Sequence, residues 1–390
     1  MEPLEGTVVV DLTQNVAGPL CTQILSDLGA RVIKVEPPGR GDSAREWRPH
    51  DSPASNIFLA LNRNKESIVV DADRPEGQRI IQSLAARADV FVHSLKPGSA
   101  ESRHLGYEEL AGLNPRLVYC AISAFGEAGP LKSFPGFDPL LQALAGLMHM
   151  PADHPPDRVS VSLVDMGTGM WAAMGILAGL AHRARTGRGV RVAASLMETA
   201  LAWQTLAISN YLNFGVESAA PTGAIAPYET FRTRDGWVMI AAGNDRFFER
   251  LRQALDVPEL ADRDRFGSNP LRVKHRAEVH RLLEAATVRY PTAELVERLR
   301  AAGVPAGPVQ HVEAFLEDPQ AQSAGMTAAV SLPDGTRWQY VYTPIRLGGE
   351  RGSIRRSPPL ALGRDTDAVL DEWGFTEDER RRLRADGIIA

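Results

Sequence analysis

One carboxylate stands out in this sequence because its neighbours are apolar. Asp165 is the sole charged residue between Arg158 and His182, and it lies in the run VSLVDMGTGM. A lone acid in apolar surroundings needs a structural partner or a chemical task, because burying a charge is costly. One interpretation is that its side chain caps a helix that begins at Met166. The other is that it acts as a nucleophile, which the backbone amides at the start of that helix keep ionised. The two roles are compatible, and both stay open.

Three loops carry further groups that are suited to binding an anion. The first, residues 11–19, leads into a helical pattern, and backbone amides at a helix start attract phosphate or carboxylate. This loop has one glycine in place of the GxGxxG of dinucleotide-binding folds, which argues against a nicotinamide-dependent oxidoreductase. Arg40 and Lys96 lie in the other two loops, within GRGD and KPG. Each cation suits a phosphate, although each loop alone is also typical of an ordinary surface turn.

These loops follow the strands of a predicted parallel sheet. Short β-branched runs alternate with helical patterns over residues 8–123, which is typical of an α/β fold with helices on both faces of the sheet. The predicted strands are residues 8–10, 32–35, 67–70, 89–92 and 117–123, and the predicted helices are residues 20–28, 75–87 and 107–113.

The middle of the chain differs in character and predicts a second domain. Two helices rich in small residues are expected at 166–185 and 195–212, separated by a turn at Thr186-Gly187-Arg188-Gly189. A β-hairpin follows, with strands at 230–233 and 237–240, and helical patterns then continue to about residue 301.

Composition narrows the class of protein. The 390 residues are 44% hydrophobic and include 43 Lys and Arg against 48 Asp and Glu, so disorder and nucleic-acid binding are not expected. The two cysteines, Cys21 and Cys120, have no spacing that indicates a disulfide or a metal site. No signal peptide is recognisable, and the apolar stretch 166–181 is shorter than the roughly 18 residues that span a bilayer. We therefore expect a cytoplasmic protein without a membrane span.

Many short motifs match one known family in its own order. They include Ala17-Gly18-Pro19, Leu28-Gly29-Ala30, Arg40-Gly41-Asp42, Asn62-Arg63-Asn64-Lys65, Pro135-Gly136-Phe137-Asp138, Asp165 with Gly169, Thr186-Gly187-Arg188-Gly189, Pro227-Tyr228 and Gly303-Val304-Pro305-Ala306-Gly307-Pro308. With these motifs the sequence resembles the class III CoA-transferases, which include formyl-CoA transferase and carnitine CoA-transferase. The α-methylacyl-CoA racemases are relatives of that family.

The resemblance implies an enzyme that moves CoA from an acyl-CoA to a carboxylic acid. Asp165 matches the family's nucleophile, which forms a mixed anhydride and then an aspartyl-CoA thioester. The CoA contacts implied are Val16, Ala17, Arg40, Asp71, Ala72, Asp73, Leu95, Lys96, Arg103, Phe137 and Asp138. CoA and acyl-CoA are substrates in this scheme, and neither a permanently bound cofactor nor a metal is implied. Succinyl-CoA is a common donor in the family, and a dicarboxylate is a reasonable acceptor.

The resemblance also implies a Rossmann-like large domain from both chain ends, residues 1–215 and 340–390. A smaller α+β domain would comprise residues 216–339, and two chains would interlock as a homodimer. In the family a glycine-rich loop covers the site, and Pro221-Thr222-Gly223 is the nearest match here.

Two alternatives stay open. One is an isomerase of 2-methylacyl-CoA, although Phe137 stands where racemases have a proton-moving histidine and formyl-CoA transferase has tyrosine. Phenylalanine can neither transfer a proton nor donate a hydrogen bond. The other is a non-catalytic CoA-binding homologue.

Overall fold

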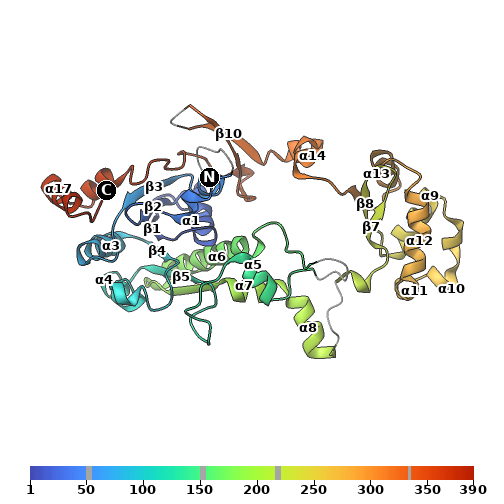
Figure 1. Cartoon of the computed structure of the whole chain (residues 1–390), viewed down its shortest axis with the longest axis horizontal. Helices are drawn as coiled ribbons and strands as arrows, with labels where there is room; N and C mark the ends of the chain where they lie inside the picture. The colour runs from blue at the N-terminus through green and yellow to red at the C-terminus, as the bar shows by residue number, and fades with distance from the viewer. Residues whose placement is uncertain (50–54, 150–154, 216–220, 333–334) are drawn as a thin grey trace. The chain divides into compact units, whose positions relative to one another are not determined.

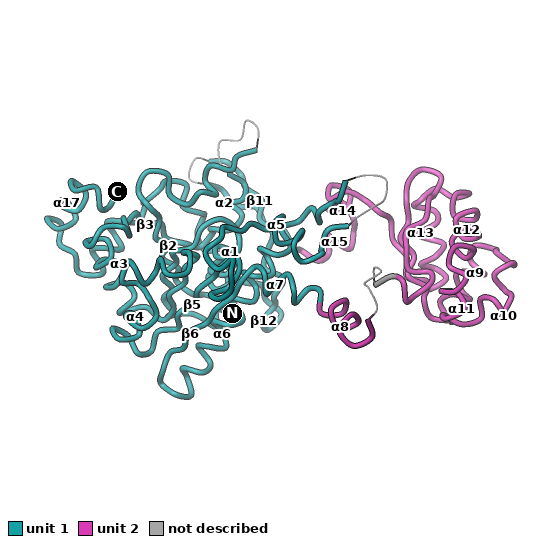
Figure 2. The backbone as a smooth tube through the Cα atoms, turned by 60° about the horizontal axis from the view of Figure 1, so that its bottom comes forward, with its two compact units in different colours: residues 1–204, 326–390 teal, residues 205–325 magenta. Residues whose placement is uncertain are grey.

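The computed structural model describes residues 1–49, 55–149, 155–215, 221–332 and 335–390 (Figure 1). The chain forms two compact units, which Figure 2 distinguishes by colour. The large unit contains residues 1–204 and 326–390, and the small unit contains residues 205–325. Both boundaries of the small unit fall earlier than the predicted 216–339, whose first residue lies outside the described part of the chain.

Residues 326–339 belong to the large unit because their hairpin packs there. The hairpin pairs β10 (Thr327–Ser331) with β11 (Arg337–Val341). Its Leu332 lies in one apolar cluster with Ala44, Phe58 and Leu59 of the N-terminal part. The hairpin therefore returns the chain to the large unit before the C-terminal helices.

The large unit is built on a six-stranded parallel sheet in the order β3-β2-β1-β4-β5-β6. Its strands are β1 (Val8–Leu12), β2 (Arg31–Glu36), β3 (Lys65–Val69), β4 (Val90–His93), β5 (Val118–Ser123) and β6 (Arg191–Ser195). The predicted α/β fold is confirmed. The strand order reverses direction between β1 and β4, and loops at the carboxyl ends of two such strands form the usual ligand site of an open sheet.

Helices cover both faces because alternate residues of each strand point to opposite sides. Val9 and Val90 pack with α1 (Ala17–Asp27) and α6 (Leu163–Thr186) in one apolar cluster. Val10 and Phe91, one residue further along, belong to the cluster on the opposite face. That face carries α3 (Pro75–Arg87), α4 (Tyr107–Leu113), α16 (Thr366–Glu372) and α17 (Glu377–Ala385).

The predicted helix at 195–212 differs from the structure in two respects. Its first residue belongs to strand β6, which was not predicted, and the helical part divides into α7 (Leu196–Trp203) and α8 (Thr205–Phe214). Strand β6 is rich in alanine, so its sequence lacks a strand pattern, and it is extended because it pairs along β5.

Helix α6 is longer than predicted. By length and composition its 24 residues would suffice to cross a bilayer. Within the fold, its residues Val164, Ala172 and Ala173 are buried in the cluster that contains α1. It therefore serves as a core helix of the large unit.

The small unit contains the predicted hairpin, β7 (Tyr228–Arg232) and β8 (Trp237–Ala241), to which β9 (Ala306–Pro308) adds a third antiparallel strand. Helices pack on this sheet around Phe231, Val238 and Ile240. They are α9 (Asp245–Leu255), α10 (Arg263–Phe266), α11 (Asn269–Lys274), α12 (Arg276–Thr287) and α13 (Thr292–Ala301), and α14 (Val312–Glu317) and α15 (Pro319–Ala324) follow.

Candidate active site

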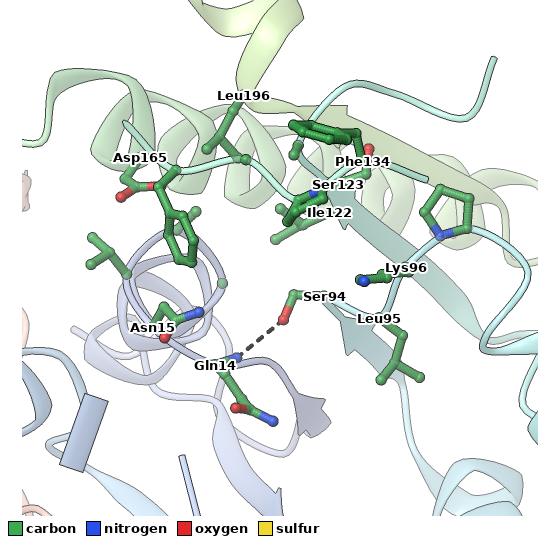
Figure 3. A pocket seen from close by; sticks show the side chains of 18 of the residues that line it. Gln14, Asn15, Ser94, Leu95, Lys96, Ile122, Ser123, Phe134, Asp165 and Leu196 are labelled. Carbon is green, nitrogen blue, oxygen red and sulfur yellow. Dashed lines mark hydrogen bonds between the residues drawn. The ribbon is translucent and has the colours of Figure 1, made fainter. Parts of the chain in front are cut away.

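A pocket of ≈ 240 Å³ lies at the carboxyl ends of β1, β4 and β5 (Figure 3). The loop after β1 contributes residues 14–18, the loop after β4 contributes 94–97, and the loop after β5 contributes 132 and 134–137. Asp165 reaches the same pocket from the start of α6. It is the only carboxylate among the described residues that line this pocket. The topology therefore places the one conspicuous acid of the sequence at the switch point of the sheet.

Asp165 does not cap its helix, because α6 begins earlier than the sequence predicted. The helix starts at Leu163, so Asp165 lies in its first turn. The capping role belongs to Asp138, whose carboxylate accepts the backbone N–H groups of Val164 at 2.6 Å and Asp165 at 3.0 Å. The Asp165 carboxylate has no hydrogen-bond or ion-pair partner within the described part of the chain. Its two oxygens are thus left for a ligand in the pocket.

The surroundings of Asp165 favour its protonated form. Burial, and to a smaller extent the negative charge of Asp138, together raise its pKa from 3.8 to about 7. A carboxylate that is poorly solvated and not paired with a cation is a stronger base and a stronger nucleophile than one in water. At neutral pH, a substantial fraction of Asp165 is still ionised and able to attack.

Helices α1 and α6 approach each other closely beside the pocket. A Cβ atom at Gly169 would lie 2.5 Å from the carbonyl oxygen of Ala17, so only glycine fits there. Because Ala17 opens α1 and Asp165 lies in the first turn of α6, this contact fixes the two helix starts with respect to each other. Helix α1 has no side-chain cap, which leaves its first amides available to an anion.

Three consecutive residues of the turn before α1 are held by hydrogen bonds from their backbone N–H groups. Thr13 donates its backbone N–H to Asp11, Gln14 donates to the Ser94 hydroxyl, and Asn15 donates to Asp42, at 2.8, 3.1 and 3.0 Å. These hydrogen bonds hold the first backbone N–H groups of α1 in a fixed arrangement. Donors held in this way can stabilise developing negative charge without rearranging.

Buried charges beneath the turn supply this anchoring. Lys34 lies on β2 with a fully buried side chain, donates to the Thr13 carbonyl at 2.8 Å and pairs with Asp42 at 2.8 Å. Lys65 on β3 contacts Asp11 at 3.3 Å, and burial lowers its pKa to about 8. Neither lysine was predicted as a site residue, although a lysine inside the apolar run Val32-Ile33-Lys34-Val35 is a visible signal.

Hydrogen bonds of His93 also fix the loop after β4. His93 accepts the Leu95 backbone N–H on Nδ1 at 3.2 Å, so its Nε2 carries the proton and donates to the Tyr119 hydroxyl at 2.8 Å. Tyr119 in turn donates to the Leu105 carbonyl at 3.2 Å. Burial lowers the pKa of His93 to about 4, so this imidazole is neutral at physiological pH. His93 therefore positions the loop that carries Lys96.

Six of the predicted site residues line the pocket, namely Val16, Ala17, Leu95, Lys96, Phe137 and Asp165. The side chain of Phe137 is 57% exposed and offers no atom for proton transfer, and no histidine lines the described part of the pocket. Trp47, Lys132 and Phe134, which also line it, were not predicted. They lie beside the motifs Arg40-Gly41-Asp42 and Pro135-Gly136-Phe137-Asp138 but are not part of them.

The other predicted residues lie elsewhere. Asp138 is 2% exposed, its carboxylate accepts two helix amides and it does not line the pocket, so its role as a CoA contact stays a prediction. Arg103 pairs with Asp73 at 2.5 Å on the loops after β4 and β3, where Asp71 and Ala72 also lie outside the pocket. Arg40 lines a neighbouring hollow of ≈ 440 Å³ that includes Trp338.

Comparison with known proteins assigns the chain to a family. A model of CoA-transferase family III matches residues 4–366. Succinyl-CoA:glutarate CoA-transferase from Mus musculus is 36% identical, with 100% of this chain and 91% of that protein covered. Succinyl-CoA--D-citramalate CoA-transferase from Chloroflexus aurantiacus is 35% identical, with coverages of 99% and 98%. The crystal structure of a CAIB/BAIF family protein from Brucella suis is 35% identical, has a TM-score of 0.83, and covers 95% of this chain and 99% of its own. The chain therefore belongs to CoA-transferase family III.

Proposed function

We propose that this protein moves CoA from an acyl-CoA to a carboxylic acid, with Asp165 as the nucleophile. The observation that carries the proposal is the position of Asp165. It lies at the start of α6, in the pocket at the sheet switch point, and no cation among the described residues neutralises it. The relatives named as CoA-transferases support the same reaction.

The chemistry needs only the carboxylate and two substrates. Asp165 attacks the thioester carbon, the C–S bond breaks, and CoA leaves as a thiolate while a mixed anhydride forms. The thiolate then attacks the Asp165 carbonyl and releases the first acid. The second acid attacks the aspartyl thioester and displaces the CoA thiolate, which gives a second mixed anhydride. The thiolate then attacks the acyl carbon of that acid, so the new acyl-CoA forms and the Asp165 carboxylate is released. Each step preserves an activated acyl group, so the reaction requires that water be kept away from the intermediates.

We assign CoA binding to the loops at this edge of the sheet. The first amides of α1, at Val16 and Ala17, would face the thioester. Lys96 is suited to a phosphate of CoA, and it has no acidic partner within the described residues. Arg40 and the Arg103–Asp73 pair lie on adjoining strand ends and are candidates for the remaining phosphates.

We propose a dicarboxylic acid as one of the exchanged acids. The relatives carry glutarate, D-citramalate and oxalate in their names. Lys132 also lines the pocket, has no acidic partner in the described part of the chain and is not assigned to CoA. An unmatched cation in this pocket favours a substrate that brings an additional negative charge.

We further propose a cytoplasmic homodimer. Helix α6 exposes Met170, Trp171 and Met174, and α8 exposes Leu206 and Phe214. Exposed apolar side chains gathered along helices favour burial against a partner of the same kind. A sedimentation mass of twice the chain's 42.4 kDa would support the dimer, and a mass of one chain would contradict it.

The test is an exchange assay with succinyl-CoA and a panel of mono- and dicarboxylic acids, in which CoA thioesters are identified by mass. The expected result is a new thioester with at least one acid and its absence with Asp165→Asn. Asp386→Asn is a matched control, because Asp386 is exposed and far along the sequence from the pocket residues. Transfer by Asp165→Asn at the wild-type rate would contradict the proposal.

A further inference from the structure

Asn15 has no part in the chemistry described so far, yet its conformation is unusual. Its backbone has a φ of +70°, in the left-handed region that asparagine adopts more readily than most residues. Its N–H donates to Asp42, which is fully buried and paired with Lys34. The position of Asn15 is therefore tied to a buried ion pair of the large unit.

The side chain of Asn15 is oriented as well. Its Oδ1 accepts the hydroxyl hydrogen of Ser43 at 2.5 Å. Because the amide is planar, a fixed oxygen also fixes the direction of Nδ2. Neither N–H of Nδ2 has a partner among the described residues. Asn15 lines the pocket with Asp165, and Figure 3 shows its side-chain nitrogen directed toward the pocket interior.

A neutral donor suits the reaction better than a charged one at this place. Attack by Asp165 pushes negative charge onto the acyl oxygen before the C–S bond breaks, and that charge needs a hydrogen-bond donor. A lysine beside Asp165 would instead pair with the carboxylate and weaken it as a nucleophile. The neighbouring Val16 side chain carries no donor, and the side-chain amide of Gln14, which also lines the pocket, has no partner among the described residues to orient it. Asn15 therefore supplies the oriented side-chain donor of this turn.

We propose that Asn15 is a catalytic residue whose Nδ2–H donates to the acyl oxygen while Asp165 attacks. The Asp165 oxygen forms a bond to the acyl carbon, the C–S bond breaks, and its electron pair leaves with the CoA thiolate. Asn15 neither gains nor loses a proton in this step. The proposal rests on the CoA-transferase function proposed above and adds a residue to its site.

The test compares Asn15→Gly with the wild type in the exchange assay. Glycine keeps the positive φ and the backbone N–H to Asp42, so only the side-chain amide is removed. Loss of an oxyanion donor costs about 10²-fold in kcat, and since the donor acts on the transition state, the KM for acyl-CoA should change little. Ser43→Ala, which frees the amide to rotate, should lower kcat by a smaller factor.

Three outcomes separate the claims. A selective fall in kcat, with thermal unfolding of Asn15→Gly close to that of the wild type, supports the catalytic role. Unchanged kcat, or a rise in KM with kcat retained, overturns it and leaves the transferase function intact. Absence of transfer by the wild type with every acid of the panel overturns both the function and the role of Asn15.

Discussion

The carboxylate of Asp138 accepts the backbone N–H of Asp165 at 3.0 Å, which holds the two acids together at the start of α6. Asp138 thus has two effects on the same residue. It fixes the backbone from which Asp165 projects, and its charge adds to the effect of burial in raising the pKa of the Asp165 carboxyl. One buried side chain therefore influences both the position and the proton affinity of Asp165.

The rate of transfer should depend on pH through Asp165. The ionised form attacks, and burial raises its pKa to about 7, so kcat/KM should fall about tenfold per pH unit below that value and level off above it. A pH profile of kcat/KM for acyl-CoA measures this directly. A flat profile between pH 5 and 8 would contradict the assignment.

Asp138→Asn should move this profile to lower pH. Asparagine keeps an oxygen that accepts the helix amides, but it removes the charge that disfavours ionisation of Asp165. The inflection of the pH profile should therefore shift down from about 7. An inflection that stays in place or moves up would show that Asp138 does not act electrostatically on Asp165.

Asp165→Asn should stabilise the folded protein at alkaline pH. The folded-state pKa, about 7, lies above the ordinary value of 3.8, so the folded protein keeps a proton that the unfolded chain releases between these values. In the wild type, the contribution of the Asp165 carboxyl to the free energy of unfolding is fully present at low pH and is lost as pH rises through 7. Because the asparagine does not ionise, the free energy of unfolding of the variant should exceed that of the wild type by at most about 4 kcal/mol at pH 8.

Denaturant titrations of both proteins at pH 4 and pH 8 measure that difference. The difference in unfolding free energy should be near zero at the lower pH and favour the variant at the higher pH. Equal stabilities at both values would mean that the Asp165 carboxylate is well solvated.

Gly169→Ala should separate α6 from α1. The added methyl group would lie 2.5 Å from the Ala17 carbonyl oxygen, a contact that only a backbone shift relieves. We expect a stability loss of about 1–3 kcal/mol and a fall in transfer, because Asp165 moves relative to the amides that follow Val16. Gly112→Ala in α4 is the control, since no atom lies within 4 Å of its added carbon. Equal behaviour of the two variants would argue against a positioning role for Gly169.

The sheet could be predicted from the sequence because its strands carry their own pattern. Val8, Val9 and Val10 and the corresponding runs of β2 to β5 are apolar and β-branched, and each is followed by a helical pattern. Strand β6 could not be predicted in this way, because its alanines have no preference for extended structure and only the edge of β5 makes it a strand.

The site was predictable where one residue carried its own signal. Asp165 is conspicuous in an apolar run, whereas Val16 and Ala17 came from the family resemblance, because the helical pattern starts only at Leu20 and α1 starts at Ala17. The bonds of Asp138 could not be predicted, because its partners, the amides of Val164 and Asp165, are distant in sequence. The same holds for Asn15, whose orientation depends on Asp42 and Ser43 from another loop.

The most direct test of the account is to trap the covalent intermediate. The protein is incubated with succinyl-CoA, quenched with hydroxylamine and digested, and the peptide that contains Asp165 is analysed by mass spectrometry. An aspartyl anhydride or thioester reacts to a hydroxamate, so the account predicts this modification at Asp165 in the wild type and none without acyl-CoA. Transfer of CoA in the same sample with Asp165 unmodified would contradict the central claim.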